Sequence, residues 1–472
     1  MTVSCRTAQP MKVRALDEGS LFVNDTGRFF LASDAFAQRL HDDALSQAET
    51  DELRLQGNII DPDDDFSLHS HAYGIAERLG GANSLDYLIL VPTLRCNLDC
   101  SYCQVSRAGV NQRGFDWSDE TLGGVLRSID ELATDSIKIE FQGGEPTLRP
   151  DLLRTIIERC ERFAHKQFVI CTNLQNLSAD VLSIFDRDDV YISTSLDGSI
   201  AMHRMQRTGP LTDAFLDNLS SLTARYGPGK ISALPTLDPR APADIDEIID
   251  TFSAFGLTSI FLRPINFQGF ARKRHKQSRE QDEGWRSYYE RFVRRIIERN
   301  WLDKSSVLEE SYFSICLRRV FQPGADRHVD LRNPNPVGVD YVVIDYDGTV
   351  YPTDEARMLA RSGVIDLSIG DVQTGWNTPE RLALNEASTN QFDPSCTVCA
   401  YQPFCGRDLI DDLARYGRVD IERTETEFCR KHLHIFDFVF EPIYSQDPAV
   451  RYSLAMWLRL PAIPEQLGVR IS

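Results

Sequence analysis

The sequence contains no apolar run that approaches the roughly 18 residues needed to cross a bilayer. Residues 1–19 also lack the uninterrupted apolar stretch of a secretory signal. Basic side chains are in the minority, with 51 lysines and arginines against 70 aspartates and glutamates, so the formal net charge is −19. A nucleic-acid partner would require a concentrated basic surface, and this charge argues against one. We therefore predict a cytoplasmic protein with no membrane segment and no nucleic-acid partner.

Cysteine, in contrast, is plentiful. The chain has 11 cysteines in 472 residues. Thiols stay reduced in the cytoplasm, so disulfides do not account for them. Seven of the cysteines fall into two groups, and this grouping points to metal ligation. The length predicts roughly two to four domains.

Strand-like and helix-like segments alternate from about residue 86 to residue 300. Parallel strands need helical crossovers, so six β–α units in succession predict an α/β fold with a partial (β/α)6 barrel. In barrel-like α/β folds the chemistry lies at the carboxyl ends of the strands. The predicted strands are residues 86–95, 136–144, 166–174, 190–198, 230–237 and 259–266. The predicted helices are residues 118–133, 150–166, 178–188, 211–227, 244–256 and 284–300.

The segments on either side of this array look different. Residues 1–85 contain a predicted hairpin that turns at Asn24–Gly27, and an acidic stretch near residue 61 suggests a boundary. Beyond residue 300 the alternation stops, a second hairpin is predicted over residues 340–352, and cysteines gather in residues 396–429. The predicted domains are residues 1–85, 86–300, 301–435 and a C-terminal extension over 436–472.

The first cysteine group follows the first predicted strand. Cys96, Cys100 and Cys103 form a C-x3-C-x2-C array, with Tyr102 just before the last cysteine. Three thiolates can hold a [4Fe–4S] cluster and leave its fourth iron open to a small chelating ligand. The alternatives are zinc or unrelated structural cysteines, but zinc usually takes four ligands in short-spaced pairs.

Polar residues and glycines stand near the ends of later strands, where they would face such a ligand. Glycines let a backbone approach a ligand closely, carboxylates accept from an ammonium group, and arginine suits a carboxylate. The candidates are Gly143, Gly144 and Glu145 after the second strand, Ser195 and Asp197 at the end of the fourth, and Arg207.

In this pattern the sequence resembles the radical S-adenosylmethionine (SAM) superfamily, in its peptide-maturase branch with a C-terminal SPASM-type domain. The resemblance covers about residues 86–435. It implies that Cys96, Cys100 and Cys103 hold a [4Fe–4S] cluster that binds SAM and cleaves it reductively to a 5′-deoxyadenosyl radical. It further implies contacts of Tyr102 with adenine, Glu145 with the SAM amino group, Ser195 with ribose and Arg207 with the SAM carboxylate, with Asn173 as a weaker candidate.

The second cysteine group comprises Cys396, Cys399, Cys405 and Cys429. Four thiolates suffice for a fully ligated [4Fe–4S] cluster, and a four-cysteine zinc site is the alternative. The C-x2-C-x5-C spacing is similar to that of SPASM auxiliary-cluster domains, which favours iron and sulfide.

The sequence also departs from the SPASM pattern. Thr353 and Leu409 stand where that pattern has cysteines, so we predict a single auxiliary [4Fe–4S] cluster. By resemblance to sulfatase-maturing relatives, Asp354 is the candidate general base; alternatively, it is a salt-bridging carboxylate near Arg357. Cys160 and Cys171 are predicted to be small buried core residues.

Four segments together resemble the His-Xaa-Ser system radical SAM maturases, as the B-type member of the pair: residues 21–33, 91–107, 260–266 and 351–359. This resemblance implies modification of a ribosomally made precursor peptide, beside a second, paired radical SAM maturase and an electron donor such as flavodoxin or ferredoxin. Residues 1–85 would capture the peptide or act as a lid. The alternatives are a formylglycine-generating enzyme like the anaerobic sulfatase maturases, and a non-enzymatic iron–sulfur or zinc scaffold.

Overall fold

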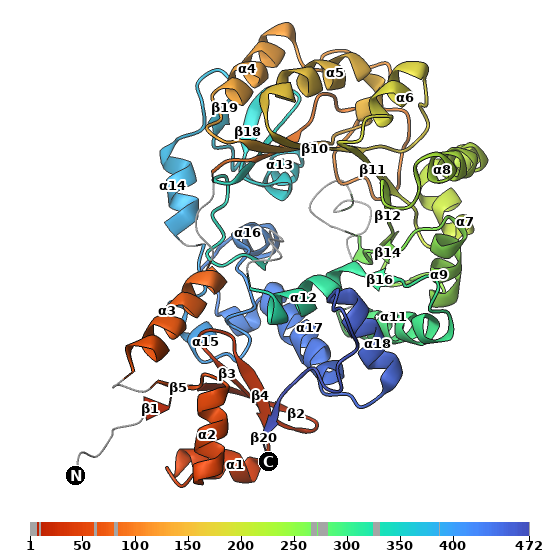
Figure 1. Ribbon diagram of the computed structural model, residues 1–472. Coiled ribbons are helices and arrows are strands. Elements are labelled where there is room, and N and C mark those ends of the chain that lie inside the picture. The colour runs from red at the N-terminus through yellow and green to blue at the C-terminus, as the bar shows by residue number, and fades with distance from the viewer. Residues whose placement is uncertain are drawn as a thin grey trace. The chain divides into compact units, whose positions relative to one another are not determined.

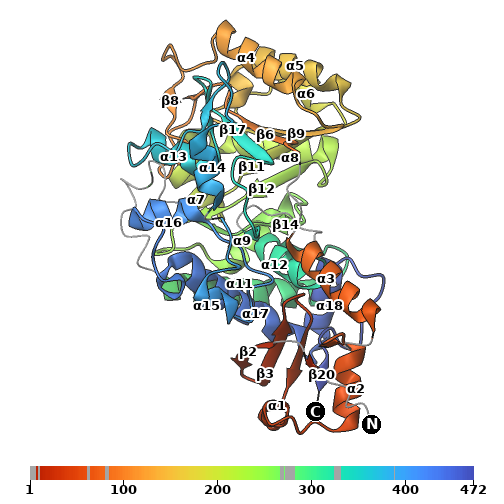
Figure 2. The ribbon, with the colours of Figure 1, turned by 90° about the vertical axis from the view of Figure 1, so that its left-hand side faces the viewer.

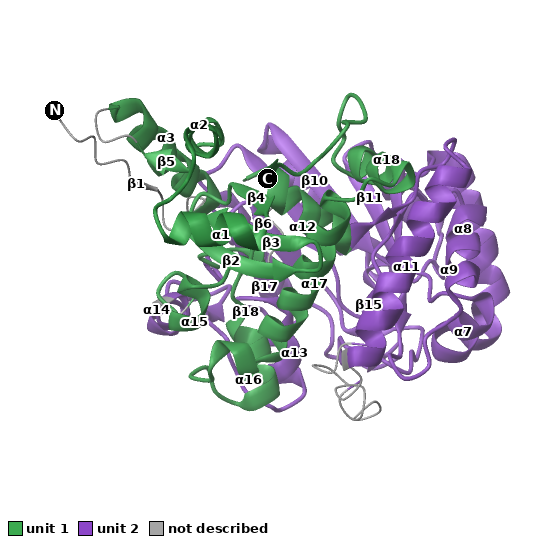
Figure 3. Cartoon of the chain, turned by 90° about the horizontal axis from the view of Figure 1, so that it is seen from below, with its two compact units in different colours: residues 1–81, 312–335, 387–472 green, residues 82–311, 336–386 purple. Residues whose placement is uncertain are grey.

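The computed structural model describes residues 7–8, 11–60, 64–79, 84–265, 271, 282–323, 331–386 and 388–471. The chain divides into two compact units, which Figure 3 colours separately. We call residues 82–311 with 336–386 the sheet unit, and residues 1–81, 312–335 and 387–472 the terminal unit. The division into domains at residues 85, 300 and 435 stays a prediction.

An eight-stranded sheet organises the sheet unit (Figure 1). Its order is β12-β11-β10-β9-β6-β17-β18-β19, and the first six of these strands are parallel. β18 and β19 are antiparallel to their neighbours, so the sheet is mixed. Their bounds are β6 (Tyr87–Leu90), β9 (Ser136–Phe141), β10 (His165–Cys171), β11 (Val190–Ser195), β12 (Ile231–Leu234), β17 (Tyr341–Ile344), β18 (Thr349–Tyr351) and β19 (Gly370–Asp371).

Helices connect the parallel strands, and all six predicted helices are present. In Figures 1 and 2, α4, α5 and α6 lie along one face of the sheet. Ser118 and Ser178 cap α4 and α6 by accepting a hydrogen bond from a backbone N–H of the first turn. The alternate residues of β9 and β10, such as Ile139 and Phe168, are fully buried. The helices are α4 (Asp119–Asp130), α5 (Pro150–Arg159), α6 (Ala179–Phe185), α7 (Ile200–His203), α8 (Thr212–Tyr226), α9 (Ile245–Ala254), α11 (Asp282–Leu302), α13 (Asp354–Arg361) and α14 (Pro379–Glu386).

The last two predicted strands depart from the expectation. The fifth is divided at Pro235, and its second part, β13 (Thr236–Leu237), pairs with β15 (Arg263–Pro264). The sixth predicted strand contributes β15 and β14 (Ser259–Ile260), and β14 pairs with β16 (Glu309–Glu310) outside the eight-stranded sheet. Proline has no N–H to donate to a neighbouring strand, which explains why regular pairing is interrupted there.

The hairpin predicted over residues 340–352 is present as β17 and β18, and β17 also extends the main sheet beside β6. Within the same unit, β7 (Arg95–Cys96) pairs in parallel with β8 (Ala108–Gly109). Among the described residues, none of the helices combines the length and the apolar character that a membrane crossing needs.

A four-stranded sheet of order β2-β3-β4-β20 lies in the terminal unit. β2, β3 and β4 form the predicted N-terminal antiparallel hairpin and its extension, whereas β20 comes from residues 470–471 and pairs in parallel with β4. Phe22, Phe30, Phe36 and Ile471 pack in one core. The elements are β1 (Thr7–Ala8), β2 (Met11–Leu16), β3 (Gly19–Asn24), β4 (Phe29–Ala32), α1 (Asp34–His41), α2 (Gln47–Leu55), β5 (Ile59–Ile60), α3 (Asp65–Leu79), α12 (Ser311–Phe321), α15 (Pro394–Thr397), α16 (Leu409–Tyr416), η7 (Arg423–Glu425), α17 (Glu427–Ile443), α18 (Pro448–Trp457) and β20 (Arg470–Ile471).

Candidate active site

The cysteines of the first motif lie in one loop beyond the carboxyl end of β6. Cys96 ends β7, and Cys100 and Cys103 follow in the loop, each of them half-buried. Burial, together with the nearby charges of Glu145, Cys100 and Cys103, raises the pKa of Cys96 to about 12. Thiols that crowd one another in this way stay protonated until a metal displaces the protons. The loop therefore gathers three potential ligands in one place.

Two glycines fix this loop by letting backbone approach backbone. A Cβ atom on Gly144 would lie 2.2 Å from the carbonyl oxygen of Arg95, and one on Gly143 would lie 2.4 Å from that of Thr93. Gly143 also has a φ of +119°, in the region that favours glycine. The N–H of Gly144 donates to the Thr93 carbonyl at 3.0 Å, and that of Glu145 donates to the Arg95 carbonyl at 2.8 Å. The turn after β9 is thus fastened to the residues just before the first cysteine.

Glu145 is fully buried, and its carboxylate accepts four hydrogen bonds from the protein. Its Oε1 accepts from Thr147 N at 3.1 Å, Thr147 Oγ1 at 2.6 Å and Thr172 Oγ1 at 2.8 Å. Its Oε2 accepts from Asn173 N at 2.7 Å, and Asn173 Nδ2 lies 3.7 Å from Cys96 Sγ. Burial raises the pKa of Glu145, and these hydrogen bonds oppose the rise. Glu145 therefore ties the end of β9 to the end of β10 beside the cysteine loop.

Tyr102, Asp197 and Arg207 form a chain of polar contacts next to the same loop. Tyr102 OH donates to Asp197 Oδ2, and Arg207 Nη1 donates to Tyr102 OH at 3.2 Å. Asp197 is fully buried and also accepts from Thr236 N at 3.2 Å. The positive charge of Arg207 lowers the pKa of the Cys100 thiol against the larger effect of burial. Arg207 Nε is buried without a hydrogen-bond partner among the described residues, so the guanidinium has a donor left for an anionic ligand.

His203 is a contributor that the sequence interpretation missed. Asp197 N donates to His203 Nδ1 at 3.2 Å, and the imidazole stacks on Phe215 with ring centroids 4.4 Å apart. Burial lowers the pKa of His203 to about 3, so the ring is neutral at pH 7. Its local signal was its place six residues after Asp197. Ser195, predicted for ribose, ends β11 and is partly exposed.

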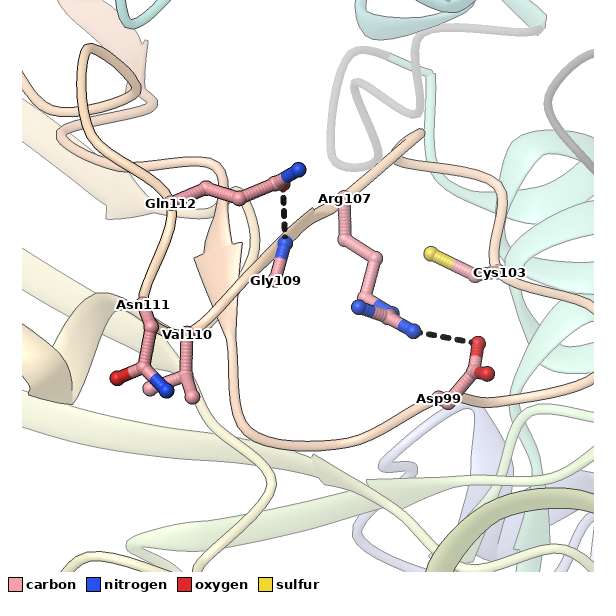
Figure 4. Close-up of a pocket in the computed structure, with 7 residues that line it drawn as sticks. All are labelled: Asp99, Cys103, Arg107, Gly109, Val110, Asn111 and Gln112. Atoms are coloured by element: carbon pink, nitrogen blue, oxygen red, sulfur yellow. Dashed lines mark hydrogen bonds and ion pairs between the residues drawn. The ribbon is translucent and has the colours of Figure 1, made fainter.

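A cavity of about 650 Å³ opens beside Cys103 (Figure 4). Arg107 Nη2 pairs with Asp99 Oδ1 at 2.6 Å across it, and Gly109 N donates to Gln112 Oε1 at 2.7 Å. Its walls are Asp99, Cys103, Arg107 and residues 109–112. The open space at this loop is therefore large enough for part of a small-molecule ligand.

Glu140 and Cys171 form a second polar group on the sheet. They alternate along β9 and β10 with buried apolar residues, so they point to the opposite face from them. Tyr87 OH donates to Glu140 Oε2 at 2.6 Å, and Cys171 Sγ donates to Glu140 Oε1 at 3.3 Å. Cys160 is a buried core residue as predicted, whereas the same prediction for Cys171 is wrong because this residue is only half-buried and its thiol bonds to a carboxylate.

The thiol of Cys171 should react slowly with iodoacetamide in the native protein. Burial and the negative charge of Glu140 raise the pKa of Cys171 well above its ordinary value, so little of the reactive thiolate exists at pH 8. Mass-spectrometric mapping should find Cys171 alkylated much faster in urea than in buffer. Glu140→Gln removes the charge and should speed alkylation of the native protein. Equal rates in urea and buffer would contradict this account.

Asp354 lies at the first position of α13, where Thr353 caps the helix by accepting from Ala356 N at 3.0 Å. Asp354 Oδ1 accepts from Arg357 Nε at 2.7 Å, so the alternative predicted for this carboxylate, an ion pair with Arg357, is present. Arg357 is fully buried, and its Nη1 lies 3.7 Å from Asp345 Oδ1. The negative charge of Asp354 also raises the pKa of Cys171, so this carboxylate belongs to the polar group of Glu140 and Cys171.

The four cysteines of the second motif come together within the terminal unit. Cys396 lies in α15 and Cys429 in the first turn of α17. Burial raises the pKa of Cys405, and the nearby thiols of Cys399, Cys396 and Cys429 add to the rise. Leu409, at the position of a cysteine in the SPASM pattern, is a buried residue that begins α16.

Both cysteine groups fit an iron–sulfur cluster in their donor chemistry. Among the described residues, no three histidine, cysteine or carboxylate side chains converge on one point that would hold a metal ion. The unpaired donor of Arg207 beside Cys100 fits the chelating carboxylate that a three-cysteine cluster would bind at its fourth iron.

Comparison with known proteins agrees with this chemistry. Residues 90–252 match the family model of the Radical SAM superfamily. This segment is a radical SAM domain. It contains the first cysteine motif, the glycine turn after β9, Ser195 and Arg207. The match and the fold together support an enzyme.

The radical SAM domain is also similar to an uncharacterised protein of Methanocaldococcus jannaschii, at 29% identity over 119 residues that cover 25% of this chain. The alignment spans 40% of the length of that relative. Among solved structures, a hexahistidine-tagged anSMEcpe with bound AdoMet has a TM-score of 0.60 at 16% identity and covers 79% of this chain and 98% of its own. Native anSMEcpe with bound AdoMet and Cp18Cys peptide has a TM-score of 0.59 at 17% identity and covers 76% and 98%. At these identities the likeness establishes the radical SAM fold.

Proposed function

We propose that this chain cleaves SAM reductively at a [4Fe–4S] cluster held by Cys96, Cys100 and Cys103. The observation that carries the proposal is the set of three cysteines in one loop after β6, inside the segment that matches the radical SAM family. Three cysteine ligands leave one iron for the amino and carboxylate groups of SAM. A fourth cysteine ligand in this loop would occupy the remaining iron and prevent SAM from binding to it.

The cluster and SAM, when bound, supply a 5′-deoxyadenosyl radical that abstracts hydrogen from a C–H bond. The residues of the chain hold and orient the ligand. Arg207 offers its unpaired donor to the SAM carboxylate, and Ser195 offers its hydroxyl to ribose. Tyr102 and Asp197 keep Arg207 in position, and Glu145 holds the turn that faces the SAM amino group.

We further infer that the substrate is a ribosomally made precursor peptide of the His-Xaa-Ser type, modified at a C–H position in the cytoplasm. The likeness to anSMEcpe with bound Cp18Cys peptide supports a peptide as the substrate class. A paired radical SAM maturase and an electron donor such as flavodoxin or ferredoxin complete the proposed system. Asp354 is the candidate base for the proton that the substrate loses, and its ion pair with Arg357 would hold the carboxylate in place.

The four cysteines of the terminal unit, in this proposal, hold one auxiliary [4Fe–4S] cluster in a SPASM-like arrangement. Their number leaves no open iron, so this cluster transfers electrons and does not bind SAM. Thr353 caps a helix and Leu409 lies in the core, and neither side chain is a cluster ligand.

The test is to purify the chain without oxygen, reconstitute it, and count iron and sulfide in wild type and in Cys96→Ala/Cys100→Ala/Cys103→Ala. We expect about eight irons in the wild type and about four in the variant. Reduced wild type with SAM should form 5′-deoxyadenosine, and the variant should form none. About twelve irons would mean a third cluster with other ligands. Zinc without 5′-deoxyadenosine would overturn the proposed function.

A further inference from the structure

A buried ion pair joins η7 to α16 in the part of the terminal unit that carries the second cysteine motif. Arg423 begins η7, which contacts both α15 and α17. Its Nη1 donates to Asp412 Oδ2 at 2.7 Å, and the side chains are 3% and 1% exposed. The guanidinium also lies 5.6 Å from the ring centroid of Phe428. The guanidinium therefore lies out of solvent and interacts with three of the four thiols of the motif, those of Cys396, Cys405 and Cys429.

The guanidinium of Arg423 is only partly satisfied by Asp412. Its Nε is buried without a hydrogen-bond partner among the described residues. A second arginine nearby, Arg407, also has a buried Nε that lacks a partner within the described part of the chain. Buried donors in native proteins are nearly always paired, so two orphaned N–H groups that both lie near the Cys396 thiol point to an acceptor that binds there.

The acceptor is identified by what surrounds the two donors. The positive charge of Arg423 interacts electrostatically with the thiols of Cys396, Cys405 and Cys429. That of Arg407 interacts in the same way with the thiol of Cys396. Sulfide and thiolate sulfur atoms of an iron–sulfur cluster accept N–H hydrogen bonds, and these bonds are among the factors that set its reduction potential. An uncharged ligand would leave the buried guanidinium groups with less compensation.

We propose that Arg423 raises, and its partner Asp412 lowers, the reduction potential of the auxiliary cluster, with the Arg423 Nε–H donating to a cluster sulfur. This inference rests on the proposed function, because it takes the second motif to hold a [4Fe–4S] cluster. Reduction adds one negative charge to the cluster. A buried cation beside the cluster stabilises the reduced form, and a buried carboxylate opposes reduction. Both effects are stronger in the protein interior than in water, because the dielectric constant there is low.

The two residues of the ion pair would therefore shift the reduction potential of the cluster, an effect that packing alone would not produce. Arg423 and Asp412 would act with opposite signs, although each stabilises the other in the fold. The auxiliary cluster would accept an electron more readily than the same four cysteines would allow in an uncharged pocket.

The experiment uses the full chain with Cys96, Cys100 and Cys103 changed to Ala, so that only the auxiliary cluster remains. Midpoint potentials are measured by redox titration with electron paramagnetic resonance. We expect a more negative potential for Arg423→Gln and a more positive one for Asp412→Asn. Arg423→Lys keeps the charge but loses the Nε–H, so its potential should fall between those of the parent and Arg423→Gln.

Two further variants separate this role from damage to the fold. Arg423→Gln/Asp412→Asn leaves no unpaired buried charge and should lie between the two single variants. Arg418→Gln removes an exposed ion pair with Asp420 from the same region and should leave the potential unchanged. Four irons per chain with no shift, or shifts of one sign in both single variants, would overturn the inference and leave the proposed function intact. Zinc in place of iron would instead overturn the auxiliary cluster itself.

Discussion

Replacing Gly144 with alanine is expected to abolish assembly of the SAM cluster. The added Cβ would lie 2.2 Å from the Arg95 carbonyl oxygen and 2.4 Å from that of Leu94, and both are backbone atoms. The turn and the residues before Cys96 must therefore separate. Forcing atoms into a packed site costs about 1–3 kcal/mol in the free energy of unfolding. Displacement of a reacting group by about 1 Å lowers a rate by ~100-fold, and we expect at least that loss of 5′-deoxyadenosine formation.

Iron analysis, 5′-deoxyadenosine formation and urea unfolding together test this expectation. Gly229→Ala is the matched control, because nothing lies within 4 Å of a Cβ atom there. The control should keep the iron content and the rate of the wild type. A Gly144→Ala protein with full iron content and an unchanged rate would show that the contact between the two backbones does not position the cysteine loop.

Replacing Arg357 with methionine should lower the free energy of unfolding by about 3–5 kcal/mol. The guanidinium is fully buried between Asp354, at 2.7 Å, and Asp345, at 3.7 Å. Its removal leaves the two carboxylates without their cation, and an uncompensated buried charge is much more costly than a lost exposed pair. Urea denaturation measures the change.

Two control variants test this prediction: one also removes a carboxylate partner of Arg357, and the other removes an exposed arginine. Arg357→Met/Asp354→Asn removes one of the two carboxylates and should be less destabilised than Arg357→Met alone. Arg418→Met breaks an exposed ion pair with Asp420 and should leave the unfolding midpoint in urea nearly unchanged. If Arg357→Met unfolds at the same urea concentration as Arg418→Met, the buried pair does not stabilise the fold as argued.

The sequence was most informative where local chemistry determines structure. The helices were predictable because their apolar spacing and caps, such as Ser118 and Ser178, lie within a few residues of one another. The cysteine loop and the turn at Gly143 were likewise recognisable from short motifs. The sixth strand was not, because its pairing depends on Pro264 and on a partner near residue 309.

Side-chain partners were harder to predict than their elements. Glu145 and Asp197 were expected to face a ligand, but the structure also gives them protein donors from the next strand or loop. His203 was missed because one histidine in a helix carries no distinctive local pattern. The polar partner of Cys171 lies on the adjacent strand, and a periodicity argument treats one strand at a time.

The sheet that begins with β2 has a consequence for the order in which this chain acquires its structure. Residues 29–32 can pair with β20 only after residue 471 has been synthesised, and Ile471 fills a core made otherwise by residues near Phe22 and Phe30. Contacts between segments so distant in sequence form late and slow folding. A nascent N-terminal segment would thus expose the edge of β4 and its apolar residues until residues 470 and 471 have been synthesised. A fragment of residues 1–85 produced alone would remain in that unfinished state, so binding studies on it would examine an edge that the whole chain covers with its own backbone.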